Sequence, residues 1–301
     1  MDFRLGFLRR SAGTDGNPEP AEQREEIHEP PSSRSLEVRA SALTHVGRVR
    51  SENQDAVNVT RPTAPEPFAK YGVLAMVADG MGGHAGGEIA STIACRAVPN
   101  IYFSSSEPPQ MALQNAVLAA NAEIYAMAQT RPELQGMGTT CVALAVVADM
   151  AWMTYVGDSR LYLRRDAKLY RLTEDHSVVY EMVTQGLLSR EEARNHRDRN
   201  VLSRALGSKS EVRTSGWETA FRVFSNDRFL LCSDGLHDLL DDNELLEMMA
   251  TPEIDRTTAH MIEVANERGG YDNISAVLVE IFDNSGGPRT PPNPTREVTL
   301  A

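Results

Sequence analysis

The sequence predicts an α+β protein in which helices pack outside antiparallel sheets. Along the middle of the chain, the apolar residues switch repeatedly between a period of two, typical of strands, and a period of about 3.6, typical of helices. Several strand-like segments also follow one another directly, at 139–148, 151–157 and 160–164. Strands in direct succession favour hairpins, so a purely alternating βαβ arrangement does not fit this order.

The remaining elements follow from the same periodicity, taken in chain order. Strands are also expected at 38–46, 71–78, 228–233 and 274–282. One helix is expected at 88–98, and another at 109–129 would place on one face Leu113, Val117, Ala120, Ile124 and Met127. A third helix over 256–268 has Asp255 as its expected N-cap and ends at Gly269-Gly270.

Two end segments differ in composition from the middle of the chain. Residues 11–35 and 284–301 are rich in Pro, Gly, Ser or Glu and contain few large apolar side chains. Such segments bury too little apolar surface to offset the entropy of ordering. We therefore predict one folded domain over 36–283, preceded by an extension over 1–35 that is disordered or docks on a partner, and followed by a flexible tail over 284–301.

Composition argues against several classes of protein. The 301 residues include 30 Lys and Arg against 42 Asp and Glu, a net charge of −12, which does not suit a protein that binds nucleic-acid phosphates. The longest apolar run, 141–148, is too short to span a bilayer. No signal-peptide core follows Met1, and the three cysteines are far apart and odd in number, which favours a cytoplasmic protein without structural disulfides. The cysteines are Cys95, Cys141 and Cys232.

Aspartates recur where strand-like segments begin or end. Asp79 follows the apolar segment 71–78 and opens a loop with five glycines in residues 80–87. Similar positions are taken by Asp55, Asp158, Asp234 and Asp272. One such aspartate is an ordinary turn residue, but five that converge would repel one another and require a cation. Since neither thiolates nor paired histidines accompany them, the oxygen ligands favour Mg²⁺ or Mn²⁺.

The glycine-rich loop allows a second interpretation. Residues 80–85 fit the pattern G-x-G-x-x-A of a dinucleotide-binding turn, between a strand and a helix. However, Asp79 would repel a pyrophosphate, and no acidic residue follows about 20 positions later at a strand end to bind a ribose. A phosphate-binding P-loop is excluded because no Gly-Lys-Ser/Thr follows. We therefore favour the metal site.

Six short motifs resemble one family in their order along the chain. They are Arg50-x-x-Asn53-Gln54-Asp55, VADGMGGHAGGE (77–88), GMGTT (136–140), VGDSR (156–160), LLCSDGL (230–236) and YDNISAV (271–277). Together they resemble the metal-dependent protein serine/threonine phosphatases called PPM or type 2C, and are most similar to the bacterial branch. The resemblance covers about residues 38–282. It implies a four-layer α-β-β-α sandwich of two antiparallel sheets flanked by helices, with metal ions at one edge.

The resemblance also implies a set of metal ligands. Asp79 matches a carboxylate that bridges two ions, and the Gly80 carbonyl matches a ligand of one of them. The other implied ligands are Asp234 and Asp272 on the first ion, Asp55 on the second and Asp158 on a third, weakly held ion. The implied cofactors are thus two Mn²⁺ or Mg²⁺ ions, with a third, weaker one as in bacterial members.

Other residues match groups that act on the substrate. Arg50 resembles a guanidinium that binds the substrate phosphate, a task that suits its planar fork of donors. Many eukaryotic members have a proposed general acid, a histidine, directly after the Asp-Gly pair, whereas this chain has Met81 there. His84 is the nearest substitute, and two roles stay open for it: proton donation, or support of the glycine-rich loop.

Residues 173–210 resemble the variable flap of the family. Ser189 and Glu192 have the spacing of a capping box, which predicts a helix within this segment. The basic side chains of the segment are expected on a solvated face rather than on the substrate. They are Arg197, Arg199 and Arg204.

These residues predict transfer of a phosphoryl group to water at a two-metal centre. The four carboxylates on the two main ions contribute −4 and the ions +4, so a phosphate dianion can enter without net repulsion. No cysteine nucleophile is needed, and Cys232 is expected in the core. We expect a monomeric phosphatase that acts on proteins phosphorylated on Ser or Thr and reverses a bacterial Ser/Thr kinase. The alternative is a catalytically weak member of this fold that regulates or scaffolds partners, although every expected ligand is present.

Overall fold

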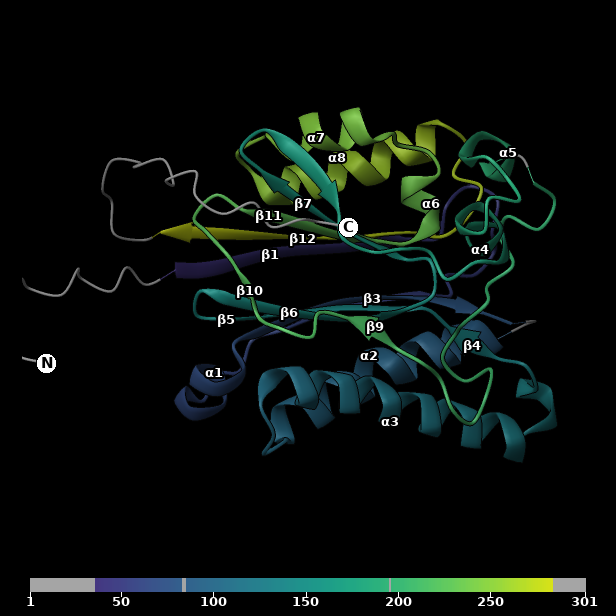
Figure 1. The fold of residues 1–301 in the computed structure, drawn as a ribbon, viewed down its shortest axis with the longest axis horizontal. Helices are drawn as coiled ribbons and strands as arrows, with labels where there is room; N and C mark the ends of the chain where they lie inside the picture. Colours follow the sequence, from purple (N-terminus) through teal and green to yellow (C-terminus); the bar gives the residue numbers. More distant parts are fainter. Residues whose placement is uncertain (1–35, 83–84, 195, 284–301) are drawn as a thin grey trace, which may run out of the picture. The chain divides into compact units, whose positions relative to one another are not determined.

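Two antiparallel sheets stack face to face, and helices cover their outer faces (Figure 1). The computed structural model describes residues 36–82, 85–194 and 196–283, which all belong to one compact unit. The order of layers is helix, sheet, sheet, helix, because each sheet has two apolar faces and must cover both. The predicted α+β class and the four-layer sandwich are therefore confirmed.

The first sheet has five strands in the order β1-β12-β11-β7-β8. Strands β1 (Leu36–His45) and β12 (Ile274–Asp283) come from the two ends of the described chain and pair over their full length. The other strands are β11 (Arg228–Cys232), β7 (Arg160–Arg165) and β8 (Lys168–Arg171). The β1–β12 pairing at one edge of this sheet therefore joins segments that are far apart in the sequence.

The second sheet has the order β10-β6-β5-β3-β2, with β4 paired to β3 and β9 paired to β6. Its strands are β2 (Asp55–Thr60), β3 (Val73–Met81), β4 (Gly138–Thr139), β5 (Cys141–Val147), β6 (Met150–Val156), β9 (Ser215–Gly216) and β10 (Phe221–Arg222). Strands β5 and β6 form the hairpin that the sequence predicted.

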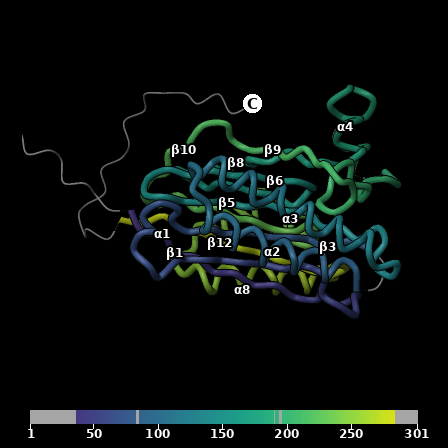
Figure 2. Tube along the Cα trace, turned by 90° about the horizontal axis from the view of Figure 1, so that it is seen from below, coloured from purple at the N-terminus to yellow at the C-terminus, as the bar shows by residue number. Residues whose placement is uncertain are grey.

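Helices lie on both outer faces. On the second sheet they are α1 (Pro65–Tyr71), α2 (Gly86–Ser104) and α3 (Pro109–Thr130), followed by the short η1 (Pro132–Leu134). On the first sheet they are α6 (Asp234–His237), α7 (Asp242–Met248) and α8 (Ile254–Glu267). The predicted flap contains α4 (Val178–Thr184) and α5 (Arg190–Arg194), and Figure 2 shows α4 projecting beyond the sheets. None of the helices in the described part of the chain is long and apolar enough to cross a membrane.

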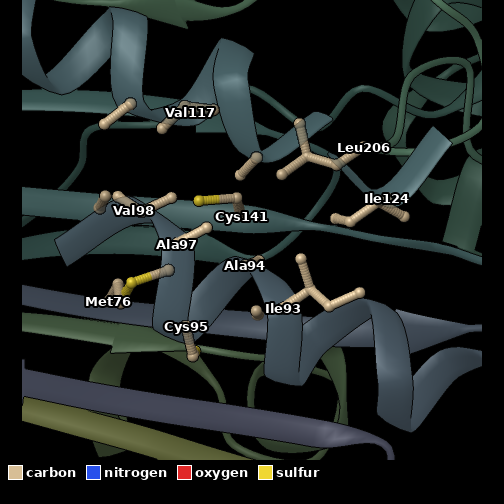
Figure 3. Packing of buried hydrophobic residues seen from close by; sticks show 14 of the residues in the cluster. Met76, Ile93, Ala94, Cys95, Ala97, Val98, Val117, Ile124, Cys141 and Leu206 are labelled. Carbon is tan, nitrogen blue, oxygen red and sulfur yellow. The ribbon is translucent and has the colours of Figure 1, made fainter. Parts of the chain in front are cut away.

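Buried apolar side chains form three clusters, one in each space between layers. Alternate residues of β3 serve two of them: Ala75 and Val77 face the other sheet, whereas Leu74 and Met76 face α2 and α3. Figure 3 shows part of the cluster under these helices. The third cluster joins the first sheet to α7 and α8 and contains Cys232, as predicted. All three cysteines are buried and unpaired.

Two predicted helix boundaries are wrong. The sequence placed the N-cap of the last helix at Asp255, but α8 begins at Ile254 after the extended Glu253, and Asp255 lies in its first turn. There its charge still suits the positive end of the helix dipole. Helix α2 also continues past Val98 through Pro99 to Ser104. Burial of the following turn outweighs the backbone hydrogen bond that proline removes.

Candidate metal and phosphate site

The aspartates predicted as metal ligands lie at one end of the sandwich, where β3 ends and α6 begins on the right of Figure 1. Asp55 and Asp79 are directly opposite each other in the β2–β3 pairing. Asp158 lies in the turn from β6 to β7, Asp234 follows β11, and Asp272 precedes β12. Where one antiparallel strand ends, its neighbour begins, so residues at these strand ends gather at the same end of the sandwich. The fold thereby brings the five aspartates together.

Close backbone packing holds the loops that bear these aspartates. A Cβ atom on Gly80 would overlap the carbonyl oxygens of Gly87 and Gln54, and the Gly80 N–H donates to the latter at 3.1 Å. A Cβ atom on Gly235 would likewise overlap the carbonyl oxygen of Asn273. Each glycine directly follows a predicted ligand, so its missing side chain allows one ligand loop to approach the next.

Threonines of the GMGTT motif fix the main chain of Asp79. Its N–H donates to Thr140 Oγ1 at 2.9 Å, while its carbonyl accepts from the Thr140 N–H and the Thr139 hydroxyl at 2.8 and 2.9 Å. Thr140 Oγ1 also lies 2.7 Å from Ser159 Oγ, next to Asp158. The predicted bridging carboxylate is therefore held in place by backbone contacts that leave its side chain free to bind.

Asp55 is held by hydroxyl groups that the sequence analysis did not identify. Ser233 donates its hydroxyl to Asp55 Oδ2 at 2.7 Å and accepts the N–H of Ser275 at 3.0 Å. Ser233 lies in the LLCSDGL motif directly before Asp234, so the motif positions two carboxylates at once. Its adjacency to a predicted ligand was the one signal in the sequence that pointed to it.

Burial and mutual repulsion disfavour the charged forms of four of the carboxylates. Burial raises the pKa of Asp55 and that of Asp234 to about 6. Burial and then the charge of Asp234 raise the pKa of Asp158 to about 8. The pKa of Asp79 is held well above its ordinary value by burial and then by the charges of the four other aspartates. Binding of a positively charged group or ion would therefore stabilise these carboxylates in their charged forms.

Arg50 supplies part of that charge. Its Nη2 donates to Asp272 Oδ2 at 2.7 Å, and this bond raises the pKa of the guanidinium. Among the residues that the structure describes, it is the only ion pair that the five aspartates form. One guanidinium leaves most of their charge uncompensated, so the site has the electrostatics of a cation-binding centre.

The donor set fits Mg²⁺ or Mn²⁺. Within 36–82, 85–194 and 196–283, no group of three or more Asp, Glu, His or Cys side chains is placed so that it could hold a metal ion. The available groups are carboxylate and backbone carbonyl oxygens, the ligands that such ions prefer.

Two histidines outside the predicted set support the turn that carries Asp158. The Gly157 main-chain N–H donates to His176 Nδ1 at 3.1 Å, and the main-chain N–H of His176 donates to the Gly157 carbonyl at 3.0 Å. The ring stacks on Tyr155 with centroids 4.9 Å apart. On the other side of the turn, His237 Nε2 lies 3.2 Å from the Asp158 carbonyl. Both contacts join distant segments, so sequence spacing gave no signal for them.

The flap agrees with its prediction in one respect and departs from it in another. Ser189 and Glu192 form the expected capping box, with main-chain to side-chain bonds of 2.8 and 3.2 Å. Arg197 and Arg199 are exposed, as expected. Arg204 instead turns inward, and its Nη1 lies 3.3 Å from His176 Nε2, because the chain returns there to the base of the flap. His84, the candidate proton donor, lies outside the described residues.

Comparison with known proteins identifies a family. The family model described as protein phosphatase 2C matches residues 47–282. The serine/threonine protein phosphatase PstP of Mycobacterium tuberculosis is 35% identical over 258 residues, which are 85% of this chain and 48% of that protein. The chain thus spans about half the length of this relative. The serine/threonine phosphatase stp of Listeria monocytogenes is 35% identical over 252 residues, 81% of this chain and 96% of that protein.

A solved structure agrees with these matches. The catalytic domain of PstP in complex with two manganese ions is 34% identical, with a TM-score of 0.72, and the match covers 82% of this chain and 100% of that one. The six motifs therefore predicted the family correctly, and its named relatives are hydrolases that act on phosphorylated serine and threonine. On its sequence and its fold alike, this chain belongs to the protein phosphatase 2C family.

Proposed function

We propose that the protein hydrolyses phosphoserine and phosphothreonine in other proteins at a centre of two Mn²⁺ or Mg²⁺ ions, with a third ion bound more weakly. The observation that carries this proposal is the cluster of buried and half-buried carboxylates whose charge is largely uncompensated, beside an exposed arginine. Such a cluster is costly for folding alone, and divalent cations would relieve its repulsion. The two manganese ions in the related PstP domain support this choice of metal.

The proposed ligands divide the work between the two main ions. Asp79 would bridge them, because the charges of the other four aspartates all act on it. The remaining assignments are Asp234 and Asp272 for one ion, Asp55 and the Gly80 carbonyl for the other, and Asp158 for the third. Bound together, the ions would supply activation of a water molecule and neutralisation of phosphate charge.

The protein's own groups would bind and orient the substrate. Arg50 has five N–H donors, and its single bond to Asp272 leaves others for the phosphate oxygens. Its planar fork would hold the phosphoryl group in one orientation while the equatorial oxygens gain negative charge. Ser233 and Thr140 would keep the carboxylates fixed during turnover. We retain His84 as the candidate proton donor to the leaving oxygen.

Wider aspects of the function follow from this activity. We propose that the protein reverses the action of a Ser/Thr kinase and works as a monomer, with the phosphatase domain over 36–283 and separate roles for 1–35 and 284–301. Three buried, unpaired cysteines support a reducing compartment such as the cytoplasm. The acidic balance argues against nucleic acid as a partner.

The activity is tested with the purified full chain after removal of metal by EDTA. Phosphate release is measured from matched phosphoserine, phosphothreonine and phosphotyrosine peptides while Mn²⁺ or Mg²⁺ is added back. We expect release from the first two peptides only when metal is present. A folded protein that releases no phosphate at any metal concentration would contradict the proposal and favour the scaffolding alternative.

A further inference from the structure

Two large apolar side chains are strongly exposed at the edge of the carboxylate cluster. Val49 and Tyr271 each expose 65% of their surface. Val49 directly precedes Arg50, and Tyr271 directly precedes Asp272. A single exposed apolar side chain is ordinary on a protein surface, but a pair beside a charged site indicates a contact region.

Two contacts join the loops that carry this pair. The Arg48 N–H donates to the Gly270 carbonyl at 2.8 Å, and the Arg50 guanidinium donates to Asp272 at 2.7 Å. Residue 49 lies between the two donors along one loop, and residue 271 lies between the two acceptors along the other. The two loops therefore run side by side, and the exposed apolar residues occupy matching positions on them.

The ring of Tyr271 is held in position although it is exposed. A Cβ atom on Gly269 would overlap the ring, so the ring lies directly over this glycine. Gly269 also has φ +128°, a conformation that other residues rarely adopt. Because the main chain already supports the ring, a ligand that packs on it has little side-chain freedom left to remove. An exposed, pre-positioned aromatic ring is a typical recognition group.

We propose that Val49 and Tyr271 form an apolar rim that recognises an apolar side chain adjacent to the phosphorylated residue of the substrate protein. The inference rests on the proposed phosphatase function, because Arg50 between these loops is the proposed phosphate-binding group. A phosphoserine or phosphothreonine that reaches Arg50 brings its neighbouring residues over the same two loops. Contact with Val49 and Tyr271 then buries apolar surface of both partners. Substrates with such a neighbour would therefore be preferred over those with a small polar one.

The test compares two phosphothreonine peptides that differ only in the residues flanking the phosphothreonine, Leu in one and Ser in the other. A small phosphate ester without flanking residues serves as the reference substrate. For the wild-type protein with Mn²⁺, we expect kcat/KM to be about tenfold higher for the Leu peptide, mainly through a lower KM. A protein that hydrolyses the ester but treats the two peptides alike would overturn the inference and leave the phosphatase activity standing. Failure to hydrolyse any of the three would instead contradict the proposed function.

Variants identify the residues responsible. Tyr271→Ala and Val49→Ser should each reduce the preference for the Leu peptide to about twofold, while Tyr271→Phe, which keeps the ring, should retain it. Met111→Ala removes a side chain that is 49% exposed on α3, outside the rim, and is the matched control. Melting temperatures verify that the variants are folded. Full retention of the preference in both Tyr271→Ala and Val49→Ser would overturn the inference, as would an equal loss in Met111→Ala.

Discussion

Buried and half-buried carboxylates occur in two settings in this protein, and their partners differ. Asp227 receives two hydrogen bonds from Arg165, at 2.8 and 2.6 Å, and its side chain is only 2% exposed. Glu280 is similarly paired with Arg228 at 3.0 and 2.5 Å. The five aspartates at the end of β3 share a single arginine, Arg50. Arginines of the protein thus neutralise Asp227 and Glu280, whereas most of the negative charge of the five aspartates has no basic partner.

The difference separates structural carboxylates from functional ones. A buried pair such as Asp227 and Arg165 satisfies its charges within the fold and needs nothing further. Arg160 and Arg171 likewise outweigh the effect of burial on Asp175 and lower its pKa overall, whereas burial still raises the pKa of Asp227 against the effect of Arg165. A cluster that raises its own pKa values instead stores repulsion, which a ligand of opposite charge can relieve. Burial alone therefore does not identify a site; burial without a partner does.

The largest expected effect comes from the centre of the unpaired cluster. Asp79→Asn keeps the shape of the side chain but removes the charge that would serve two ions, so turnover should fall at least about a thousandfold. The melting temperature of the metal-free protein should not decrease, because a source of repulsion is lost. Steady-state kinetics and thermal melts measure both effects. Near wild-type turnover in this variant would show that the five clustered aspartates are no more functional than the carboxylates paired with arginine.

Removing a carboxylate that is paired with an arginine should instead lower stability and leave turnover unchanged. Asp227→Ala leaves Arg165 without its partner, which should lower the free energy of unfolding by about 3 kcal/mol. Turnover per folded molecule should remain unchanged. Urea unfolding and kinetics below the unfolding range provide the measurements. In Glu123→Ala, a control at an exposed pair with Arg96, the change should stay below about 1 kcal/mol.

Metal removal should make stability depend on pH in a characteristic direction. The folded pKa values of Asp158, about 8, and of Asp55 and Asp234, about 6, lie above the unfolded value near 3.8. A raised folded pKa contributes stability that is present below the unfolded pKa and is lost as pH rises through the folded one. The EDTA-treated protein should therefore gain about 3 kcal/mol when pH falls from 8 to 6.

With saturating Mn²⁺ this trend should reverse, because protons compete with the metal for the same carboxylates. Urea unfolding across pH, with and without Mn²⁺, tests the contrast. Identical pH profiles in the two conditions would show that the carboxylates titrate independently of any bound ion.

Loss of the Arg50 guanidinium should weaken substrate binding more than it slows the chemical step. Arg50→Ala should raise KM for a phosphothreonine peptide about tenfold and lower kcat less, because the guanidinium contacts phosphate before as well as during the reaction. Arg50→Lys should recover part of the loss, since it keeps the charge but not the fork. An unchanged KM in Arg50→Ala would place this side chain outside the phosphate site.

A smaller effect separates two interpretations of Asp158. As a turn residue, its loss would lower stability by about 1 kcal/mol and leave catalysis unchanged. As a ligand of a third ion, its loss should reduce turnover severalfold and shift the Mn²⁺ dependence to higher concentration, with little change in melting. We expect the second pattern for Asp158→Ala. Mn²⁺ titrations of activity and melting temperature decide between the two.

The sequence predicted the ligand-bearing strand ends because they follow from local patterns. The apolar run before Asp234 correctly indicates the end of β11, whereas β3 continues two residues past Asp79 to Met81. The supports of those ends were not predictable in the same manner. Ser233 acts on Asp55 across 178 positions of the chain, and His176 reaches Gly157 because the β7–β8 hairpin returns the chain to that turn. Helix α2 continues past Pro99 for a similar reason, since packing outweighs local preference there.

The central claim, that the unpaired carboxylates form a metal centre, is tested most directly by counting the ions that they bind. Equilibrium dialysis of the EDTA-treated protein against Mn²⁺ should show at least two tightly bound ions per chain. Asp79→Asn should lose high affinity at both positions, whereas Asp227→Asn, which disrupts a paired carboxylate, should retain them. Two ions bound with unchanged affinity to Asp79→Asn would contradict the claim.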